Sequence, residues 1–317
     1  MSRLPQVELP TIRTITPDEF ERFLVEPLPP RDLEAARKFL RMQLDTGETR
    51  PEWCFVLESG GKFVARVLCY TFPGAHPEYG IYYFRFMPEM PLAERKSFIL
   101  EVTKRMHDLY GARSFTHQQR TSSDRYDENV ALFRACGFTH SSSRILYKLD
   151  LTTKSFGAVP SELTERSVTD AGEDEFLRAF QIITADTLDT EDRLRNETFG
   201  AYGGAKSFFE MMIVRDTSCD RWKLYYAPSG EIAGLSIPQF FGTSTDATIG
   251  YLGITPGYRE KGYAKAILNR AHQLLAEDGA LRMFDECDAQ NIPAKRTIEQ
   301  AGYTFEYEKE HWILTIG

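Results

Sequence analysis

The residues with the clearest chemical potential form a short turn in the second half of the chain. The turn reads Arg259, Glu260, Lys261, Gly262, Tyr263 and Ala264. Gly262 and Ala264 leave the backbone uncovered, and apolar residues at helical spacing predict that a helix starts directly after them. Such a turn presents several N–H donors and the positive end of the helix dipole to one point, which suits a pyrophosphate group.

A second reactive segment, Asp285-Glu286-Cys287-Asp288, ends a predicted strand. Side chains alternate across a strand, so Glu286 and Asp288 share one face while Asp285 and Cys287 share the other. A carboxylate with a raised pKa can take the proton of an amine. Glu286 is therefore the first candidate for a general base and Asp288 the second; the alternative is that both are solvated acids. Cys287 has no neighbouring histidine, which favours a packed cysteine over a nucleophile.

The turn and a later segment resemble the two signatures of the GCN5-related N-acetyltransferases (GNAT). The first signature, Arg/Gln-x-x-Gly-x-Gly/Ala, is met by Arg259, Gly262 and Ala264. The second requires an Asn, a small residue and a Gly-aromatic pair, and it is met by Asn291, Ala294 and Gly302-Tyr303. The resemblance is strong in the second half of the chain and weak in the first.

The resemblance implies an N-acetyltransferase that moves an acetyl group from acetyl-CoA to an amine by direct attack. The strand before the turn would bind the pantetheine arm through Leu252, Gly253 and Ile254, and a bulge would free an N–H donor for the thioester oxygen. Asn291 would lie near the cofactor, or would instead cap the helix that follows it. Some members protonate the departing thiolate with a tyrosine at the position of Ile298, so Tyr303, Tyr307 or water would have to replace it here.

The chain also repeats itself. Residues 80–117 resemble residues 250–285: Pro88 and Pro256, and likewise Gly111 and Gly279, are 168 positions apart, so this stretch aligns without a gap, and Phe138 matches Tyr303 at an offset of 165. Both copies order their elements alike: a helix such as Pro17 to Leu24 or Glu173 to Ile183, a hairpin, a strand, a long helix, a strand, a short helix and a last strand. This order indicates an α/β (α+β) fold.

The repeat predicts two domains in tandem, an arrangement similar to that of the mycothiol synthases. We expect a degenerate GNAT-like domain at 1–151, a linker at 152–162 and the acetyltransferase domain at 163–317. The resemblance implies a mixed, mostly antiparallel sheet flanked by helices in each. In the first copy, Pro91, Glu94 and Lys96 replace Arg259, Gly262 and Ala264, and Tyr126 replaces the Asn, so we expect this copy not to bind acetyl-CoA in the usual manner.

Composition limits the partners. The net charge of −8 argues against nucleic acid and mildly favours a cationic acceptor, as do the acids Asp186, Asp189, Glu191 and Asp192, although these are also compatible with a solvated helix face. We expect a cytoplasmic protein with no membrane span and no metal, because the five cysteines lack metal-ligand spacing. The acceptor would be a small-molecule amine, with a protein acceptor or a non-catalytic acyl-CoA sensor as alternatives. Pairing of the two copies would make a pseudo-dimer, so monomer and homodimer both stay open.

Overall fold

The computed structural model describes residues 10–71, 78–156, 162–215, 218–241 and 245–316. The chain divides into two compact units. Unit 1 comprises Met1–Gln119, Ser123–Ser141 and His311–Gly317, and unit 2 comprises Arg120–Ser122 and Ser142–Glu310.

The sheet of unit 1 combines antiparallel neighbours with one parallel pair. Its order is β1-β2-β3-β4-β5, followed by the unit 1 parts of β12 and β6. Neighbours from β1 to β4 are antiparallel, whereas β4 and β5 are parallel. The strands are β1 (Thr11–Thr14), β2 (Cys54–Ser59), β3 (Lys62–Tyr70), β4 (Glu78–Phe86), β5 (Ser114–Arg120), β6 (Thr139–Asp150) and β12 (Thr304–Thr315).

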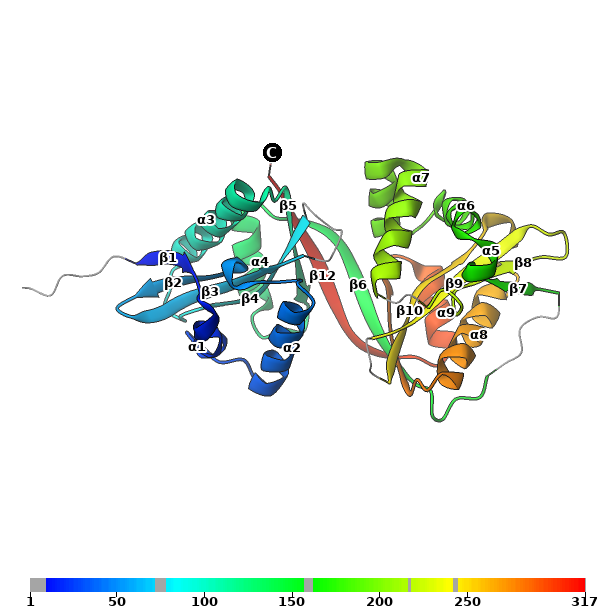
Figure 1. Cartoon of the computed structure of the whole chain (residues 1–317), viewed down its shortest axis with the longest axis horizontal. Helices are drawn as coiled ribbons and strands as arrows, with labels where there is room; N and C mark the ends of the chain where they lie inside the picture. Colours follow the sequence, from blue (N-terminus) through cyan, green and yellow to red (C-terminus); the bar gives the residue numbers. More distant parts are fainter. Residues whose placement is uncertain (1–9, 72–77, 157–161, 216–217, 242–244, 317) are drawn as a thin grey trace, which may run out of the picture. The chain divides into compact units, whose positions relative to one another are not determined.

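Helices cover both faces of this sheet (Figure 1). Adjacent residues of β2 point to opposite faces: Val56 packs in the core with α1 and α2, and Phe55 packs in the core with α3 and α4. The helices are α1 (Phe20–Val25), α2 (Leu33–Asp45), α3 (Leu92–Tyr110) and α4 (Tyr126–Ala135).

Unit 2 repeats this plan. Its strand order is β7-β8-β9-β10-β11, followed by the unit 2 parts of β6 and β12. Neighbours from β7 to β10 are antiparallel, β10 and β11 are parallel, and β11 and β6 are antiparallel. The strands are β7 (Thr164–Ser167), β8 (Lys223–Tyr226), β9 (Ile232–Phe240), β10 (Asp246–Ile254) and β11 (Arg282–Asp288).

Two groups of helices enclose the sheet of unit 2, as Figure 1 shows. One core joins α6 and α7 to the sheet around Phe180 and Leu235, and the cores on the other face join α8 and α9 around Leu268 and Met283. The long helix α7 is interrupted at Gly200, whose φ is 71°. The helices are α5 (Val168–Ala171), α6 (Glu173–Thr184), α7 (Thr190–Arg215), α8 (Tyr263–Glu277) and α9 (Ile292–Gln300).

The structure confirms the predicted fold class: mixed α/β units whose mostly antiparallel sheets are flanked by helices. The compact units differ from the segments 1–151 and 163–317 in three places. Arg120–Ser122 and residues Ser142 to Asp150 of β6 lie in unit 2, and the last part of β12, from His311, lies in unit 1. Residues 157–161 of the proposed linker lie outside the described residues.

Candidate active site

The site of unit 2 is built around a separation of two parallel strands. In the described part of the chain, β10 pairs with β11 through Asp246 and Ala247 alone. The register of β10 with β9 then shifts between Ile249 and Tyr251, which makes a bulge at Gly250. Over the rest of β10, the pairing found among the described residues is with β9, so the edge that faces β11 is open.

The predicted strand-edge residues Leu252, Gly253 and Ile254 form the last part of β10. They pair with β9 on the opposite edge, so their ladder bonds do not occupy the open one. Steric contact explains why residue 253 is a glycine: a Cβ there would lie 2.3 Å from Cγ2 of Ile183. Helix α6 therefore packs directly on the backbone of β10.

The turn at 259–264 links β10 to α8 after a 3₁₀ turn at Pro256–Tyr258. Glu260 and Gly262 have positive φ angles of 62° and 79°. Gly262 is the N-cap of α8, and a Cβ there would meet no atom within 4 Å. The α-helical bonding starts with Ala266 N donating to Gly262 O, so the N–H groups just before it have no acceptor inside the helix. This geometry can hold an anion.

Arg259 fixes the turn rather than projecting from it. Its guanidinium donates to both carboxylate oxygens of Asp186, at 2.9 and 2.8 Å, and to the carbonyls of Ile254 and Ile183, at 3.2 and 3.3 Å. These bonds tie the turn to β10 and to the end of α6. We infer that Arg259 orders the N–H groups of the turn.

The other residues of the turn are partly engaged. Glu260 and Lys261 are exposed, and Lys261 Nζ lies 4.6 Å from the ring centre of Tyr258. The Tyr263 hydroxyl donates to Glu162 Oε1 at 3.0 Å, and Ala264 packs in the core beneath the helix. Among residues 259–264, Lys261 thus offers an accessible cation.

A buried polar network lies where β10 and β11 separate. Asp285 Oδ1 accepts the Ile249 N–H at 2.5 Å and the Thr248 hydroxyl at 2.9 Å, while Oδ2 accepts the Tyr303 hydroxyl. The Tyr303 oxygen is also 2.7 Å from His272 Nε2. Burial raises the pKa of Asp285, and burial and Asp285 raise that of Tyr303. The network fixes β10 immediately before its bulge.

This placement bears on Tyr303 as a candidate acid. The tyrosine is 6% exposed and packs in the core with Leu268 and Met283. Its hydroxyl is already committed to Asp285 and His272. Tyr303 therefore stabilises the strand separation from within the core. Ile298 packs against the same core. The ring of Tyr307 contacts the Arg120 guanidinium, whose Cζ lies 3.8 Å from the ring centre.

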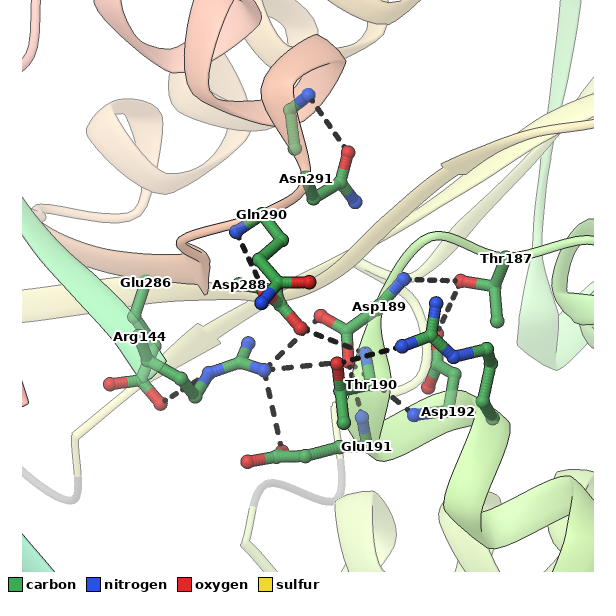
Figure 2. A network of polar contacts seen from close by, with 12 residues as sticks. Arg144, Thr187, Asp189, Thr190, Glu191, Asp192, Glu286, Asp288, Gln290 and Asn291 are labelled. Carbon is green, nitrogen blue, oxygen red and sulfur yellow. Dashed lines mark hydrogen bonds and ion pairs between the residues drawn. The ribbon is translucent and has the colours of Figure 1, made fainter. Parts of the chain in front are cut away.

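Glu286 lies in an ion-pair network with two cations, drawn in part in Figure 2. Its Oε1 is 3.3 Å from Arg144 Nε, and its Oε2 is 2.7 Å from Lys309 Nζ. Arg144 also reaches Asp189 at 3.1 Å and Glu191 at 3.5 Å. Burial opposes the charge of Arg144, but these carboxylates raise its pKa above the usual value. The Glu286 side chain is 33% exposed, so solvent reaches this acid.

Asp288 and Asn291 act as backbone caps. Asp288 is buried, and its carboxylate accepts Thr190 N at 2.9 Å and Gln290 N at 2.8 Å. Asn291 Oδ1 accepts Ala294 N at 3.2 Å, so the structure shows Asn291 in the capping role at α9 (Figure 2). Both Asp288 oxygens are thus engaged, Oδ2 at the start of α7 and Oδ1 in the turn before α9.

Asp192 and Tyr251 form a second buried pair on the α6–α7 face of the sheet. The Tyr251 hydroxyl donates to Asp192 Oδ2 at 2.8 Å, and Arg195 donates to Oδ1 at 2.7 Å. Burial, followed by the charge of Asp189, raises the pKa of Asp192. Tyr251 follows the bulge directly, so this pair lies next to the open edge of β10.

Sequence reasoning missed several of these residues. Arg144 belongs to the first half of the sequence, and its pairing with Glu286 depends on the register of β6 with β11. His272 was detectable as a polar residue on the apolar face of α8, between Ala271 and Leu275. The alternation of side chains along β11 predicts that Asp285 and Glu286 lie on opposite faces of the sheet, but it does not predict the contacts of Asp285 with Ile249 and Thr248.

Among the described residues, no group of three or more His, Cys, Asp or Glu side chains has a geometry that could hold a metal ion. None of the described helices combines the length and apolar character needed to cross a membrane.

Comparison with known proteins gives a family and a fold. Residues 193–303 match the model of the acetyltransferase (GNAT) family. A GCN5-related N-acetyltransferase from Sphaerobacter thermophilus has a TM-score of 0.67 at 15% identity, covering 96% of this chain and 95% of that one. A tandem GNAT protein from the clavulanic acid biosynthesis pathway has a TM-score of 0.58 at 14% identity, covering 98% and 99%.

A third similar structure is the glucosamine N-acetyltransferase region of a fungal multi-domain GH3 β-N-acetylglucosaminidase. It has a TM-score of 0.63 at 11% identity, covering 98% of this chain and 40% of that one. No curated protein sequence matches the chain. At these identities the structures show the fold alone, and the tandem neighbour shares the two-domain layout. The chain therefore has the fold of these two-domain GNAT structures, and its residues 193–303 match the GNAT family.

Proposed function

We propose that unit 2 transfers an acetyl group from acetyl-CoA to the amine of a small molecule. The family match supports acyl transfer in general. The observation that carries the finer proposal is the turn before α8, where Gly262 leaves open space at the first N–H groups of the helix. This turn and the open edge of β10 lie at the two ends of one continuous segment.

The residues present fit acetyl-CoA. The N–H groups at the start of α8 would bind its pyrophosphate, with Arg259 holding the turn in place and Lys261 adding charge. The pantetheine arm would lie along Leu252, Gly253 and Ile254, whose ladder bonds go to β9 on the other edge. When bound, acetyl-CoA would supply an acetyl group activated as a thioester.

The bulge at Gly250 would provide the backbone donor for the thioester oxygen. A bulge turns an N–H group out of the ladder, and Asp285 holds the strand in place one residue earlier through Ile249. A fixed donor that meets charge as it develops is worth roughly 2.7–4 kcal/mol in known oxyanion sites.

The incoming amine must lose a proton, because amines are mostly protonated at neutral pH. We retain Glu286 as the proposed base, since it is the more accessible of the two candidate acids on β11. An amine would have to compete with Arg144 and Lys309 for its oxygens. Asp288 is the weaker candidate because both of its oxygens cap backbone N–H groups.

Protonation of the departing thiolate is assigned to water. Ile298 carries no proton, and the Tyr303 hydroxyl is committed to Asp285 inside the core. The acids Asp189, Glu191 and Glu286 around Arg144 favour a cationic acceptor. A structural neighbour described as acting on glucosamine is consistent with a small amine.

The test is acetyl-CoA-dependent CoA release with a panel of amines: amino sugars, amino acids, diamines and a lysine-containing peptide. We expect release that depends on a small amine. Release with the peptide alone would favour protein acetylation. Acetyl-CoA binding without release for any amine would favour a sensor, a candidate supported by Ile298 in place of the tyrosine.

A further inference from the structure

Unit 1 contains a group of arginines whose charges are not balanced by acids. Arg66 on β3 and Arg85 on β4 are direct partners in the antiparallel register, so their side chains share one face of the sheet. Arg125 is the N-cap of α4 and acts electrostatically on Arg85. β4 pairs with β5 at Glu78, Tyr79 and Gly80, so Arg85 lies beyond this pairing, where the two strands separate.

Arg66 is the inner member of this group. It is fully buried, and its guanidinium donates to the carbonyls of Phe23 and Glu26 at 2.6 Å and of Leu28 at 3.1 Å. Burial, and then the charge of Arg85, lower the pKa of Arg66 to about 9. Carbonyl oxygens orient this cation but carry no full negative charge to offset it.

Arg85 and Arg125 are the outer members, and both are half-buried. The Arg85 guanidinium donates to the Phe84 carbonyl at 2.8 Å. Burial, followed by the charge of Arg125, lowers the pKa of Arg85. Within the part of the chain that the structure describes, neither arginine has a carboxylate within 4.0 Å, the ion-pair limit.

Other arginines of unit 1 show that this is unusual. Ion pairs join Arg13 to Glu19, Arg22 to Glu26, Arg37 to Glu21 and Arg95 to Glu128. Partly buried cations are normally paired. Arg125 also adds a cation at the N-terminus of α4, where the helix dipole favours an anion. An uncompensated group at this place is destabilising unless a ligand supplies the missing charge.

Aromatic side chains lie next to Arg85. Tyr82 and Tyr83 precede it closely on β4 and interact with it electrostatically. Their rings contact each other and Phe39 of α2, with centroids 5.1 to 6.0 Å apart. Tyr82 is 39% exposed, and Tyr83 has a φ of 52°, which is uncommon for a residue with a side chain. These rings offer an apolar surface beside the cations.

We infer that Arg85 and Arg125 of unit 1 bind an oxyanion, a carboxylate or phosphate group of a small molecule whose apolar part contacts Tyr82. Arginine suits this role because its planar fork donates two parallel hydrogen bonds to such groups. Arg66 stays fixed behind Arg85 and raises the local positive potential. This site is separate from the acetyl-CoA turn and does not depend on the proposed function of unit 2.

The test uses the full chain carrying Gly262→Glu, so that the turn of unit 2 does not bind phosphate. Affinity for inorganic phosphate is measured by calorimetry, and thermal unfolding is compared in phosphate, acetate and chloride at equal ionic strength. We expect phosphate or acetate to raise the melting temperature more than chloride does. A stronger response to phosphate assigns a phosphorylated ligand, and a stronger response to acetate assigns a carboxylate.

Arg85→Gln and Arg125→Gln are expected to weaken anion binding about tenfold each, as loss of a charge-assisted hydrogen bond predicts. Arg41→Gln, an exposed arginine of α2, is the matched control and should bind like its parent. Without anion, Arg85→Gln should be at least as stable as the parent, because a repulsion is removed. Equal responses to all three salts, or unchanged affinity in both variants, would overturn the inference.

Discussion

Units 1 and 2 separate their central parallel strands in the same way but differ at the start of the next helix. β4 pairs with β5 from Glu78, and β10 pairs with β11 from Asp246, at the same offset of 168 residues. In unit 2, Gly262 caps a helix that begins at Tyr263. In unit 1, the helix begins at Leu92, so the counterpart of Gly262 lies inside its first turn.

That counterpart is Glu94, and its neighbour Arg95 further distinguishes the start of α3 from the start of α8. Arg95 donates to the carbonyls of Met90 and Pro88 at 2.7 and 2.9 Å and forms an ion pair with Glu128. In unit 1, carbonyl oxygens therefore surround a guanidinium where unit 2 presents N–H donors. The two units therefore have the same strand pairing, although only unit 2 has the turn that would bind a pyrophosphate.

The strand separation itself is bridged with opposite polarity. In unit 1, His117 Nδ1 lies 2.9 Å from the Ile81 carbonyl; in unit 2, the equivalent Asp285 accepts the N–H of Ile249. His117 and Asp285 occupy equivalent positions, but His117 bonds to the carbonyl of Ile81 whereas Asp285 bonds to the N–H of the equivalent Ile249. Both units thus bridge the separation at this place, with different side chains.

The largest effect is expected when the turn of unit 2 is made to resemble that of unit 1. Gly262→Glu adds a side chain at a φ of 79° and a negative charge beside the pyrophosphate site. Acetyl-CoA affinity should fall at least about 100-fold, since backbone strain, steric block and repulsion act together. Gly279→Glu, at a φ of 97° beyond the other end of α8, is the control and should bind normally. Equal binding by both variants would remove the turn from the site.

Glu286→Gln makes the second comparison, because Gln118 holds this position in unit 1. Loss of a general base is expected to lower turnover about 100-fold. The loss should be greatest at low pH, where the amine is most protonated, and should shrink as pH rises. Steady-state kinetics across pH checks this, with Glu277→Gln on α8 as the control. A profile that matches the wild type would exclude Glu286.

Each unit holds a buried histidine whose stability effect can be measured. Burial lowers the pKa of His117 to about 4 and that of His272 to about 3, against an ordinary value of 6.5. Protons therefore bind the unfolded chain first, and stability is lost as pH falls from 6.5 towards these values. Between pH 6.5 and 5, each histidine should reduce the free energy of unfolding by about 2 kcal/mol.

Chemical unfolding at several pH values tests this comparison between the units. His117→Phe and His272→Phe should each remove one share of the pH dependence, whereas His140→Gln, an exposed histidine, should leave it intact. An unchanged slope in either Phe variant would show that the histidine titrates normally in the fold.

The smallest effect concerns Asn291, which corresponds to Tyr126 in unit 1. Asn291→Ala removes the cap of α9 and should cost about 1 kcal/mol of stability. Asn291→Asp keeps a capping oxygen and should restore that stability. If acetyl-CoA affinity falls in the Ala variant and stays low in the Asp variant, the amide also contacts the cofactor; if both bind normally, Asn291 is a cap alone.

The turn and the two faces of β11 were predictable because they depend on local sequence, and the repeat because its landmarks keep a constant offset along the chain. Gly262 before an apolar helix, and the alternation of Asp285 with Glu286, are patterns within a few residues. The partners of these residues were not predictable. Arg144 reaches Glu286 only because β6 pairs with β11 in unit 2, and Tyr303 reaches Asp285 across the core. Such contacts depend on non-local strand register.

The central claim is that unit 2 alone binds acetyl-CoA, and the stoichiometry of binding tests it most directly. Titration calorimetry of the intact chain with acetyl-CoA should give one site per chain. Two sites would show that unit 1 binds the cofactor despite Glu94 and Arg95. No binding would contradict the proposed function of the turn at Gly262.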